Sequence, residues 1–438
     1  MGGWLCCRRR AVPDRDEPAL SRVELAGDHV FDVSLRRVPG RRMSARGASS
    51  ATVRSTTVIA ACGHSAVVLA ATLIDMTRQK LRTILVEGFT SIKEASVELN
   101  DLNVLIGANG AGKSNLIKAL QMLGRIMDGE LGLFTGVAGG ASALRTVDSL
   151  PTAPIRLRVD FSGVGYLAEL VPAAGDELVF YEEAIWERGG EPLRPAARGY
   201  RETMVPNPDA PWWELAILIV EAIRGCRVYH FHDTSRTAAV KQNAYAADNE
   251  VLHADAANLA PVLRRLRDGD RKSYQRIVDM IRQVAPFFRD FVLDPELSPE
   301  RIRLRWRQQG TETIFPADAF SDGTLRFICL VTLLGQADLP GLIVLDEPEL
   351  GLHPFAIIQL AEMLRAASRK SQVLLATQSV TLMNQFGLDD LIVVERHAGG
   401  SAFERPDPDR LRDWLSDYSL GDLWEKNLLG GRPRPERG

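Results

Sequence analysis

The sequence has little cysteine and no pattern that would join cysteines to each other or to a metal. Five cysteines occur among 438 residues, and none forms a CxxC or Cys/His spacing. This usage favours a reducing, cytoplasmic compartment. The chain also lacks an excess of positive charge, because its formal net charge is -3. Contact with nucleic acid would therefore have to rest on a local basic patch.

The chain lacks a good membrane-spanning run. The weakly apolar residues 57–74 are interrupted by Gly63, His64 and Ser65, so we expect no membrane insertion; a signal peptide or anchor is the alternative interpretation. Residues 1–56 show neither the strand nor the helix period. We therefore predict a disordered or mis-annotated leader at residues 1–75 and a natural start at Met76.

A phosphate-binding pattern follows the apolar residues 102–106 (LNVLI). This run is typical of a buried parallel strand, and it leads into GANGAGKS and then into a helical pattern. The glycines let backbone amides point at phosphate oxygens beside the positive end of that helix. We expect ATP and Mg²⁺ here, with Lys113 on the β and γ phosphates and Ser114 on the metal. The expected nucleotide-binding residues are Gly107, Ala108, Asn109, Gly110, Ala111, Gly112, Lys113, Ser114 and Asn115.

A second apolar run, residues 342–345, ends in two carboxylates. A strand that ends in Asp346 and Glu347 would put one carboxylate near the magnesium ion and the next near the attacking water. We expect Asp346 to be a metal ligand and Glu347 to be the general base. Solvated surface charge is the alternative interpretation of this pair.

The residues before the second run distinguish this P-loop protein from kinases and small GTPases. Residues 320–325 read FSDGTL and continue into a helical pattern. Ser321, Asp322 and Gly323 open that helix, whose amides would face an anion. Such a loop suits the γ-phosphate of ATP bound to a partner subunit.

In this combination the chain resembles the ABC ATPases, in which a signature loop precedes the second catalytic strand and completes the site of a partner. ABC transporters usually carry the sequence LSGGQ in this loop, whereas this chain has FSDGT. The FSDGT form is similar to the loop of the RecF, RecN and SMC branch, and in particular to that of compact RecF-like ATPases of the AAA-15 and AAA-21 families. The resemblance covers residues 82–433. It implies an ATP-dependent homodimer. It also places Gln378 where many relatives carry a switch histidine, and His353 either near a dimer interface or in ordinary helix-start packing.

The resemblance and the residue patterns together predict an α/β P-loop fold of the ABC type. We expect a mixed central sheet, an antiparallel β lobe and an inserted helical lid, which prolines and the absence of heptads keep compact. The predicted division is a core with the P-loop and β lobe at 76–200, an inserted helical lid at 201–310, a core with the signature loop at 311–400 and a helical tail at 401–438.

Two further clusters have alternative interpretations. His230, His232 and Asp233 could form a metal site, or a structural or nucleotide-sensing loop. Arg301, Arg303, Arg305 and Arg307 alternate as on a strand, so they could form a cationic stripe for DNA phosphates or a solvated face.

The predicted activity is magnesium-dependent hydrolysis of ATP to ADP and phosphate by a dimerising ATPase that acts in DNA repair or DNA maintenance, with DNA as a candidate partner. The alternative is the nucleotide-sensing subunit of an anti-phage or toxin-antitoxin system, which would act through a protein effector. Gln378 cannot become cationic near neutral pH, which predicts slow or partner-dependent hydrolysis.

Overall fold

The computed structural model describes residues 79–147, 150, 152–195, 198–294, 300–397, 399–415 and 417–431, and the strands of one N-terminal hairpin. That hairpin pairs β1 (Ser21–Glu24) with β2 (Val30–Val33) in antiparallel register. It falls within the predicted leader, where the sequence shows no strand period. The apolar residues 57–74 and Met76 lie outside the described residues.

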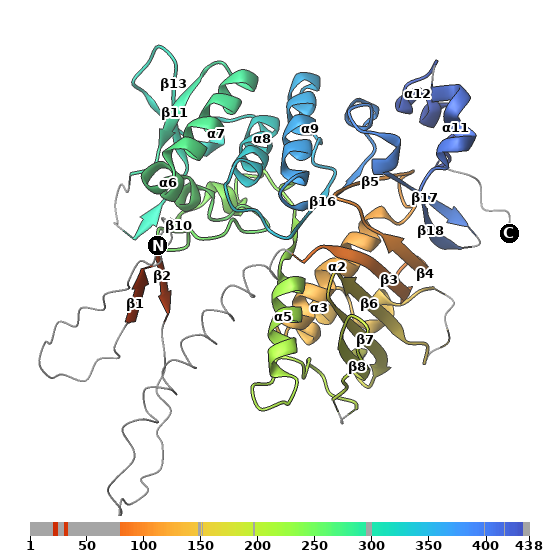
Figure 1. Cartoon of the computed structure of the whole chain (residues 1–438). Coiled ribbons are helices and arrows are strands. Elements are labelled where there is room, and N and C mark those ends of the chain that lie inside the picture. The colour runs from red at the N-terminus through yellow and green to blue at the C-terminus, as the bar shows by residue number, and fades with distance from the viewer. Residues whose placement is uncertain are drawn as a thin grey trace, which may run out of the picture. The chain divides into compact units, whose positions relative to one another are not determined.

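A mixed central sheet organises the described residues from 79 onward (Figure 1). Its strands from β17 to β9 are parallel, and β18 is antiparallel to β17. In spatial order the strands are β18 (Gly400–Glu404), β17 (Leu391–His397), β5 (Leu102–Ile106), β16 (Gln372–Thr377), β15 (Leu342–Asp346) and β9 (Cys226–Tyr229). All residues of β5 and β16 are buried. They form apolar runs because both faces of a parallel sheet are covered.

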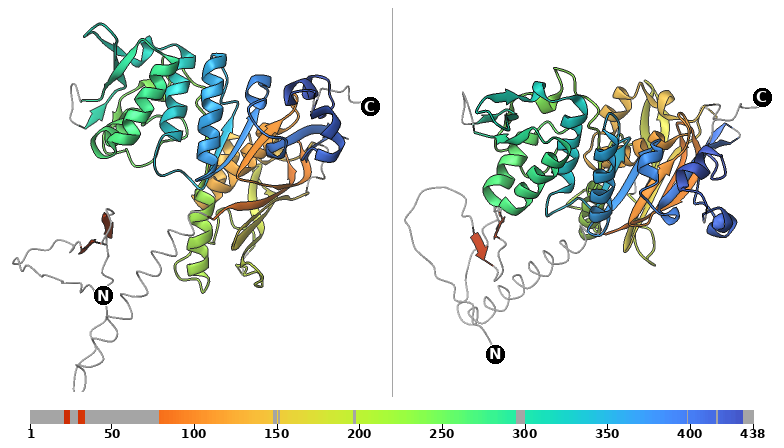
Figure 2. Two further views of the ribbon diagram at one scale, coloured as in Figure 1. Left: turned by 45° about the horizontal axis from the view of Figure 1, so that its top comes forward. Right: turned by 90° about the horizontal axis from the view of Figure 1, so that it is seen from above.

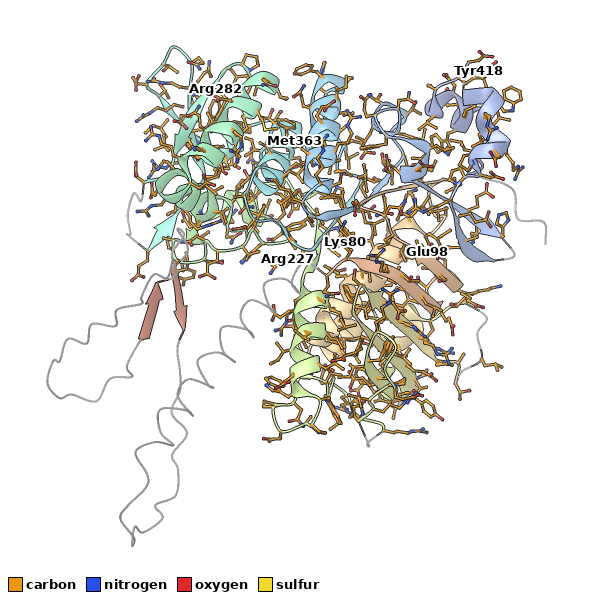
Figure 3. The ribbon with its side chains drawn as sticks, viewed as in Figure 1. Lys80, Glu98, Arg227, Arg282, Met363 and Tyr418 are labelled. Atoms are coloured by element: carbon orange, nitrogen blue, oxygen red, sulfur yellow. The ribbon has the colours of Figure 1, made fainter. Side chains whose placement is uncertain are left out.

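Successive side chains of each central strand enter two different cores. Val104 and Ile106 belong to a core with α8 (Asp322–Leu334) and α9 (Pro354–Ser368), which lie side by side (Figure 2). Met363 of α9, labelled in Figure 3, is buried in this core. Leu105 points into the opposite core, with α2 (Lys113–Met127) and α5 (Trp213–Arg224). The alternation of side chains along a strand thus fixes a helix layer on each face.

An antiparallel sheet shares the core on the α2 side. Its spatial order is β4 (Ile92–Glu98), β3 (Leu81–Phe89), β6 (Ile155–Phe161), β7 (Val164–Ala173) and β8 (Glu177–Glu187). The short helices α3 (Leu131–Val137) and α4 (Ala141–Leu144) follow α2. The expected α/β fold, with a mixed central sheet and an antiparallel lobe, is confirmed.

The segment between the two halves of the core contains α6 (Leu259–Gly269) and α7 (Arg271–Val284). Residues 201–310, predicted as a helical lid, also contain β9, which is a strand of the central sheet. Four residues are too few for a sequence period, and β9 is fixed by its pairing with the distant β15. Two small sheets complete the segment. One pairs β10 (Ala244–Tyr245) with β12 (Arg301–Ile302), and the other contains β11 (Phe288–Val292), β13 (Arg305–Gln308) and β14 (Ile314–Pro316). The 3-10 helices of this part are η1 (Ala239–Lys241) and η2 (Ala317–Ala319).

The alternating arginines do not lie on one continuous strand. Arg301 belongs to β12 and Arg305 to β13, and these strands pair in different sheets. The guanidinium carbon of Arg301 lies 4.5 Å from the ring centroid of Tyr245. Arg303 donates to Asp318 at 3.1 Å, and Arg305 donates to the Asp294 carbonyl at 2.6 Å. A cationic stripe, one of the two interpretations of this pattern, would thus be divided between two sheets, and these arginines have partners within the fold.

The C-terminal part of the described chain adds small helices beside the central sheet. They are α10 (Val380–Met383), η3 (Leu388–Asp390), α11 (Pro408–Leu415) and α12 (Leu420–Glu425). Among the described residues, no helix combines the length and apolar character needed to cross a bilayer.

Gln372 joins the two large sheets, which suggests a test of stability. Its buried side chain accepts from the Leu81 amide at 2.6 Å, and donates to the Leu81 carbonyl at 3.0 Å and the Asn100 carbonyl at 3.1 Å. Replacement by leucine leaves these groups without a partner, so Gln372→Leu should lower the free energy of unfolding by about 3 kcal/mol. Urea denaturation measures this. Gln275→Leu, on the exposed face of α7, is the control and should change it by less than about 0.5 kcal/mol.

Candidate active site

The parallel register of three strands brings the predicted catalytic residues to one edge of the central sheet. Ile106 of β5 pairs with Thr377 of β16, and Ala376 of β16 pairs with Asp346 of β15. The residues that follow these pairs therefore leave the sheet together, because parallel strands share one carboxyl edge. Those residues are Gly107, Gln378 and Glu347.

The P-loop between β5 and α2 needs glycine where it packs against the sheet. Gly107 has a φ of 156° and Gly112 a φ of 115°. A Cβ on Gly107 would lie 2.2 Å from the Val394 carbonyl oxygen, and one on Gly112 would lie 2.1 Å from Ser401 Oγ. A side chain at either position would push the loop away from β17 and β18.

The P-loop presents donors that the fold leaves unused. Among the hydrogen bonds of the described residues, none has the amide of Gly110, Gly112, Lys113 or Ser114 as its donor. These amides lie at the start of α2, where the helix dipole is positive. This arrangement is chemically suited to a phosphate group.

Lys113 places a positive charge in this loop. Its side chain is buried, and Nζ donates to the Gly107 carbonyl at 2.7 Å and the Ala108 carbonyl at 3.0 Å. Burial lowers the pKa of Lys113, and the nearby carboxylates of Glu347, Asp346 and Glu349 act in the opposite direction. The ammonium and the acidic cluster are therefore electrostatically coupled across two loops.

The carboxylates at the end of β15 differ in their environment. Asp346 Oδ1 is buried and has no hydrogen-bond partner among the described residues. Glu347 adopts a φ of 42°, in the left-handed region, and its amide donates to the Ala376 carbonyl at 2.8 Å. Gln378 Nε2 donates to Glu347 Oε1 at 2.5 Å. The structure thus brings Gln378 into direct contact with the predicted general base.

Glu349 is a third carboxylate of the site, and the sequence interpretation did not single it out. Oε1 accepts from Thr377 Oγ1 at 2.5 Å and from the Gln378 amide at 3.4 Å, whereas Oε2 is buried without a partner among the described residues. Burial is the main cause that raises the pKa of Glu349. Its position two residues after Glu347 is the signal that could have identified it.

The side chain of Asn115 is engaged within the fold. Its Nδ2 donates to Ser91 Oγ at 2.6 Å, and Ser91 Oγ lies 2.6 Å from Ser401 Oγ. These contacts join α2 to the start of β4 and to β18. The structure therefore gives Asn115 a packing partner, although it was expected to contact nucleotide.

The signature loop lies at the start of α8 and is exposed. Ser321 caps the helix, because its Oγ accepts from the Thr324 amide at 3.3 Å. Gly323 packs on the loop after β15, where an added Cβ would lie 2.2 Å from the Gly351 carbonyl oxygen. Within the described chain, no hydrogen bond joins residues 321–323 to the P-loop.

Comparison with known families agrees with this geometry. The family "AAA ATPase domain" matches residues 80–128, which contain the P-loop. The family "AAA domain, putative AbiEii toxin, Type IV TA system" matches residues 227–384, which contain the signature loop and the Asp346 strand. No curated protein sequence matches the chain.

A solved structure of an SMC head supports the same fold. A crystal structure of an Smc head bound to the C-winged helix domain of ScpA aligns with a TM-score of 0.51 and 14% identity, over 79% of this chain and 99% of that chain. The SMC head domain from Thermotoga maritima aligns over 75% of this chain and 99% of that chain, with 16% identity and a TM-score of 0.37.

The chain is therefore an ATPase with the fold of an SMC head.

The loop after β9 borders the acidic cluster of this ATPase. Burial lowers the pKa of His230, and the nearby Asp346 carboxylate opposes this effect. The ring centroids of His230 and His232 are 6.4 Å apart. These side chains belong to no potential metal-binding group of three or more ligands in the described part of the chain. Asp233 caps its own turn, since it accepts from the Ser235 amide at 3.0 Å.

Arg326 connects two loops of the ATPase, and His353 caps a helix. Arg326, which the sequence interpretation missed, donates to the Leu350 carbonyl at 2.9 Å and the His232 carbonyl at 2.8 Å. It therefore ties the signature helix to the loops after β15 and β9. His353 caps α9, because Nδ1 accepts from the Phe355 amide at 3.2 Å.

The Gln378 contact predicts a defect in turnover. Gln378→Ala removes the donor to Glu347 and should lower kcat about tenfold, with little change in nucleotide affinity, because orientation of the base is lost. Phosphate release at saturating ATP and binding of a fluorescent nucleotide measure the two quantities. Gln385→Ala is the control, since that glutamine bonds the Thr381 carbonyl. An unchanged kcat in Gln378→Ala would rule out this role.

Proposed function

We propose that this ATPase works as an ATP-dependent homodimer in DNA maintenance, in which each signature loop completes the nucleotide site of the partner. The observation that carries the proposal is the shared edge of β5, β16 and β15, which gathers Lys113, Glu347 and Gln378 beside the P-loop. ATP hydrolysis follows from the family. The roles of single residues, the metal and the dimer are the proposal.

The site has a chemical environment suited to a magnesium ion. Asp346 Oδ1 is a buried oxygen that lacks a partner within the described chain, and an unpaired buried carboxylate is costly unless a cation balances it. Asp346 and Ser114 would hold the ion. Once bound, magnesium supplies neutralisation of phosphate charge. Lys113 would add its positive charge to the same phosphates.

Glu347 is the best candidate for the general base. Its carboxylate can accept a proton from the attacking water, and Gln378 fixes the orientation of that carboxylate through Oε1. The left-handed backbone at Glu347 is the kind of local strain that functional sites retain. Glutamine stays neutral at every physiological pH, so orientation by Gln378 needs no proton.

Exposed groups around the signature loop support completion of the site by a second copy. Ser321 and Asp322 are exposed although they open α8. Beside them, Leu350 is 46% exposed, Phe355 45% and Ile358 39%. Apolar side chains next to polar loops are typical of surfaces that bind another protein. A second copy would bury them and bring its signature loop toward the P-loop.

The DNA part of the proposal rests on the resemblance of FSDGT to the RecF and SMC branch. The arginines at 301, 303 and 305 have partners within the fold, so their alternating pattern adds no support for DNA contact. A protein partner is the competing possibility, and the related Smc head was crystallised with a domain of ScpA. The alternative role beside a toxin or anti-phage effector remains a prediction from the sequence.

A hydrolysis-deficient variant tests the dimer directly. Glu347→Gln keeps the shape of the side chain but removes the base, so ATP should persist in the site. Light scattering with ATP and Mg²⁺ should then show a shift from one chain to two, and a further species with duplex DNA. Omission of Mg²⁺ should abolish the shift if Asp346 and Ser114 hold an ion that neutralises phosphate charge.

Phe355→Asp in the Glu347→Gln background is the matched control. It places charge in the exposed apolar surface without touching the P-loop, so it should bind nucleotide normally and remain a single chain. A single chain in every condition would contradict the dimer. A dimer whose mass does not change when duplex DNA is added would contradict the role in DNA maintenance and favour a protein partner.

A further inference from the structure

The C-terminal segment, residues 419–431, packs on the helix that follows Gln378. Ser419 caps α12 and accepts from the Asp422 amide at 3.2 Å. The Gly421 amide donates to Asn384 Oδ1 at 2.6 Å, and a Cβ on Gly421 would lie 2.4 Å from Val380 Cγ1. The backbone of the segment at Gly421 is therefore in close contact with the side chains of Val380 and Asn384.

Trp424 of this segment reaches both halves of the nucleotide site. Its ring lines a small pocket with Ile106, Gln378 and Met383. Ile106 is the last strand residue before the P-loop, and Gln378 contacts Glu347. Trp424 Nε1 is buried, with no hydrogen-bond partner within the described chain. Trp424 thus lines the same small pocket as the end of the P-loop strand and the switch position.

Gly431 contacts the P-loop backbone itself. Its carbonyl oxygen accepts from the Ala108 amide at 2.8 Å. A Cβ on Gly431 would lie 3.3 Å from Gly107 Cα and 3.1 Å from Trp424 Nε1, and Gly431 has a φ of 82°. The segment therefore runs along the first turn of the P-loop, at a distance that a larger residue would widen.

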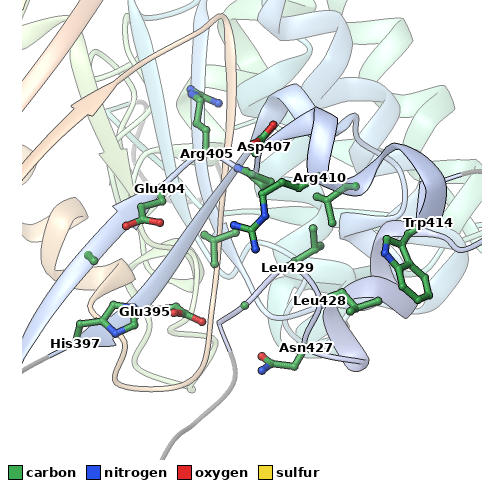
Figure 4. Close-up of a pocket in the computed structure, with 15 residues that line it drawn as sticks. Glu395, His397, Glu404, Arg405, Asp407, Arg410, Trp414, Asn427, Leu428 and Leu429 are labelled. Carbon is green, nitrogen blue, oxygen red and sulfur yellow. Dashed lines mark ion pairs between the residues drawn. The ribbon is translucent and has the colours of Figure 1, made fainter.

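Glu395 of β17 holds the end of the segment in this place. Its Oε1 accepts from the Gly431 amide, and its Oε2 forms an ion pair with His397 Nε2 at 2.8 Å. Figure 4 shows Glu395 and His397 on the strand, with Leu428 and Leu429 opposite and Trp414 farther along. Through β17, the segment is anchored to the strand on which Gly107 also packs.

We infer that residues 419–431 position the P-loop turn and Gln378, so that the C-terminal segment sets the affinity for ATP and the rate of turnover. Trp424 and Gly431 are positioning residues, which act through Ile106, Ala108 and Gln378. The inference rests on the proposed roles of the P-loop and Gln378. Its physical reason is that a loop whose amides must converge on phosphate loses affinity when it gains freedom to move.

The experiment compares Trp424→Ala, Trp424→Phe, Gly431→Ala and Trp414→Ala in the full chain. Trp424→Ala should raise KM for ATP and the Kd of a fluorescent ATP analogue about tenfold and also lower kcat, because P-loop and Gln378 are both released. Trp424→Phe should keep KM, Kd and kcat within about twofold of the wild type, since an aromatic ring would still line the pocket. Gly431→Ala should raise KM with Trp424 intact. Trp414 is 44% exposed and lies in the same tail, so Trp414→Ala should match the wild type.

The outcomes separate this inference from the proposed function. A wild-type chain that binds no nucleotide would defeat the proposed roles themselves. If the wild type binds ATP, unchanged KM, Kd and kcat in folded Trp424→Ala and Gly431→Ala would overturn the inference. A lower melting temperature with unchanged constants would also overturn it, because the contact would then be packing alone. If Trp424→Ala does not fold, Gly431→Ala decides.

Discussion

The site depends on one constraint, the parallel register of β5, β16 and β15. This register puts Gly107, Gln378 and Glu347 at the same edge, although they come from segments far apart in the chain. A shift of one residue in any strand would turn its side chains to the opposite core, because successive residues face opposite sides. Since the two faces pack against different helices, the cores themselves hold the register. Packing of apolar residues thus determines where the charged residues meet.

The charged groups at this edge of the central sheet determine which ligands it could bind. Burial lowers the pKa of Lys113 and raises that of Glu349, so desolvation acts against charge on both sides of the site. For Lys113 the nearby carboxylates offset part of this effect, and the unpartnered oxygens of Asp346 and Glu349 leave negative potential that a cation could balance. The free amides of the P-loop provide the complementary positive end. The fold accordingly maintains an arrangement that nucleotide and metal would stabilise.

Several of these connections could not be predicted from the sequence. Glu349 lies two residues after Glu347 in the sequence, but its hydrogen bonds to Thr377 and Gln378 depend on the neighbouring strand β16. The segment around Cys226–Tyr229 is too short to show a period and becomes a core strand only through β15. Arg326 acts through backbone carbonyls, which carry no sequence signal. The arginine pattern at 301–307 belongs to two different sheets, a division that the sequence does not show.

The sequence by itself determined the local elements of this ATPase. The apolar runs before the P-loop and before Asp346, the glycines of the loop and the capped start of α8 each follow from residues that are neighbours in the chain. Only the tertiary structure decided that Gln378 meets Glu347, that Asn115 turns to Ser91, and that Gly431 reaches Ala108. The reason is physical. Strand and loop signals arise from contacts within a few residues, whereas these pairings arise from the packing of whole layers, which no short segment encodes.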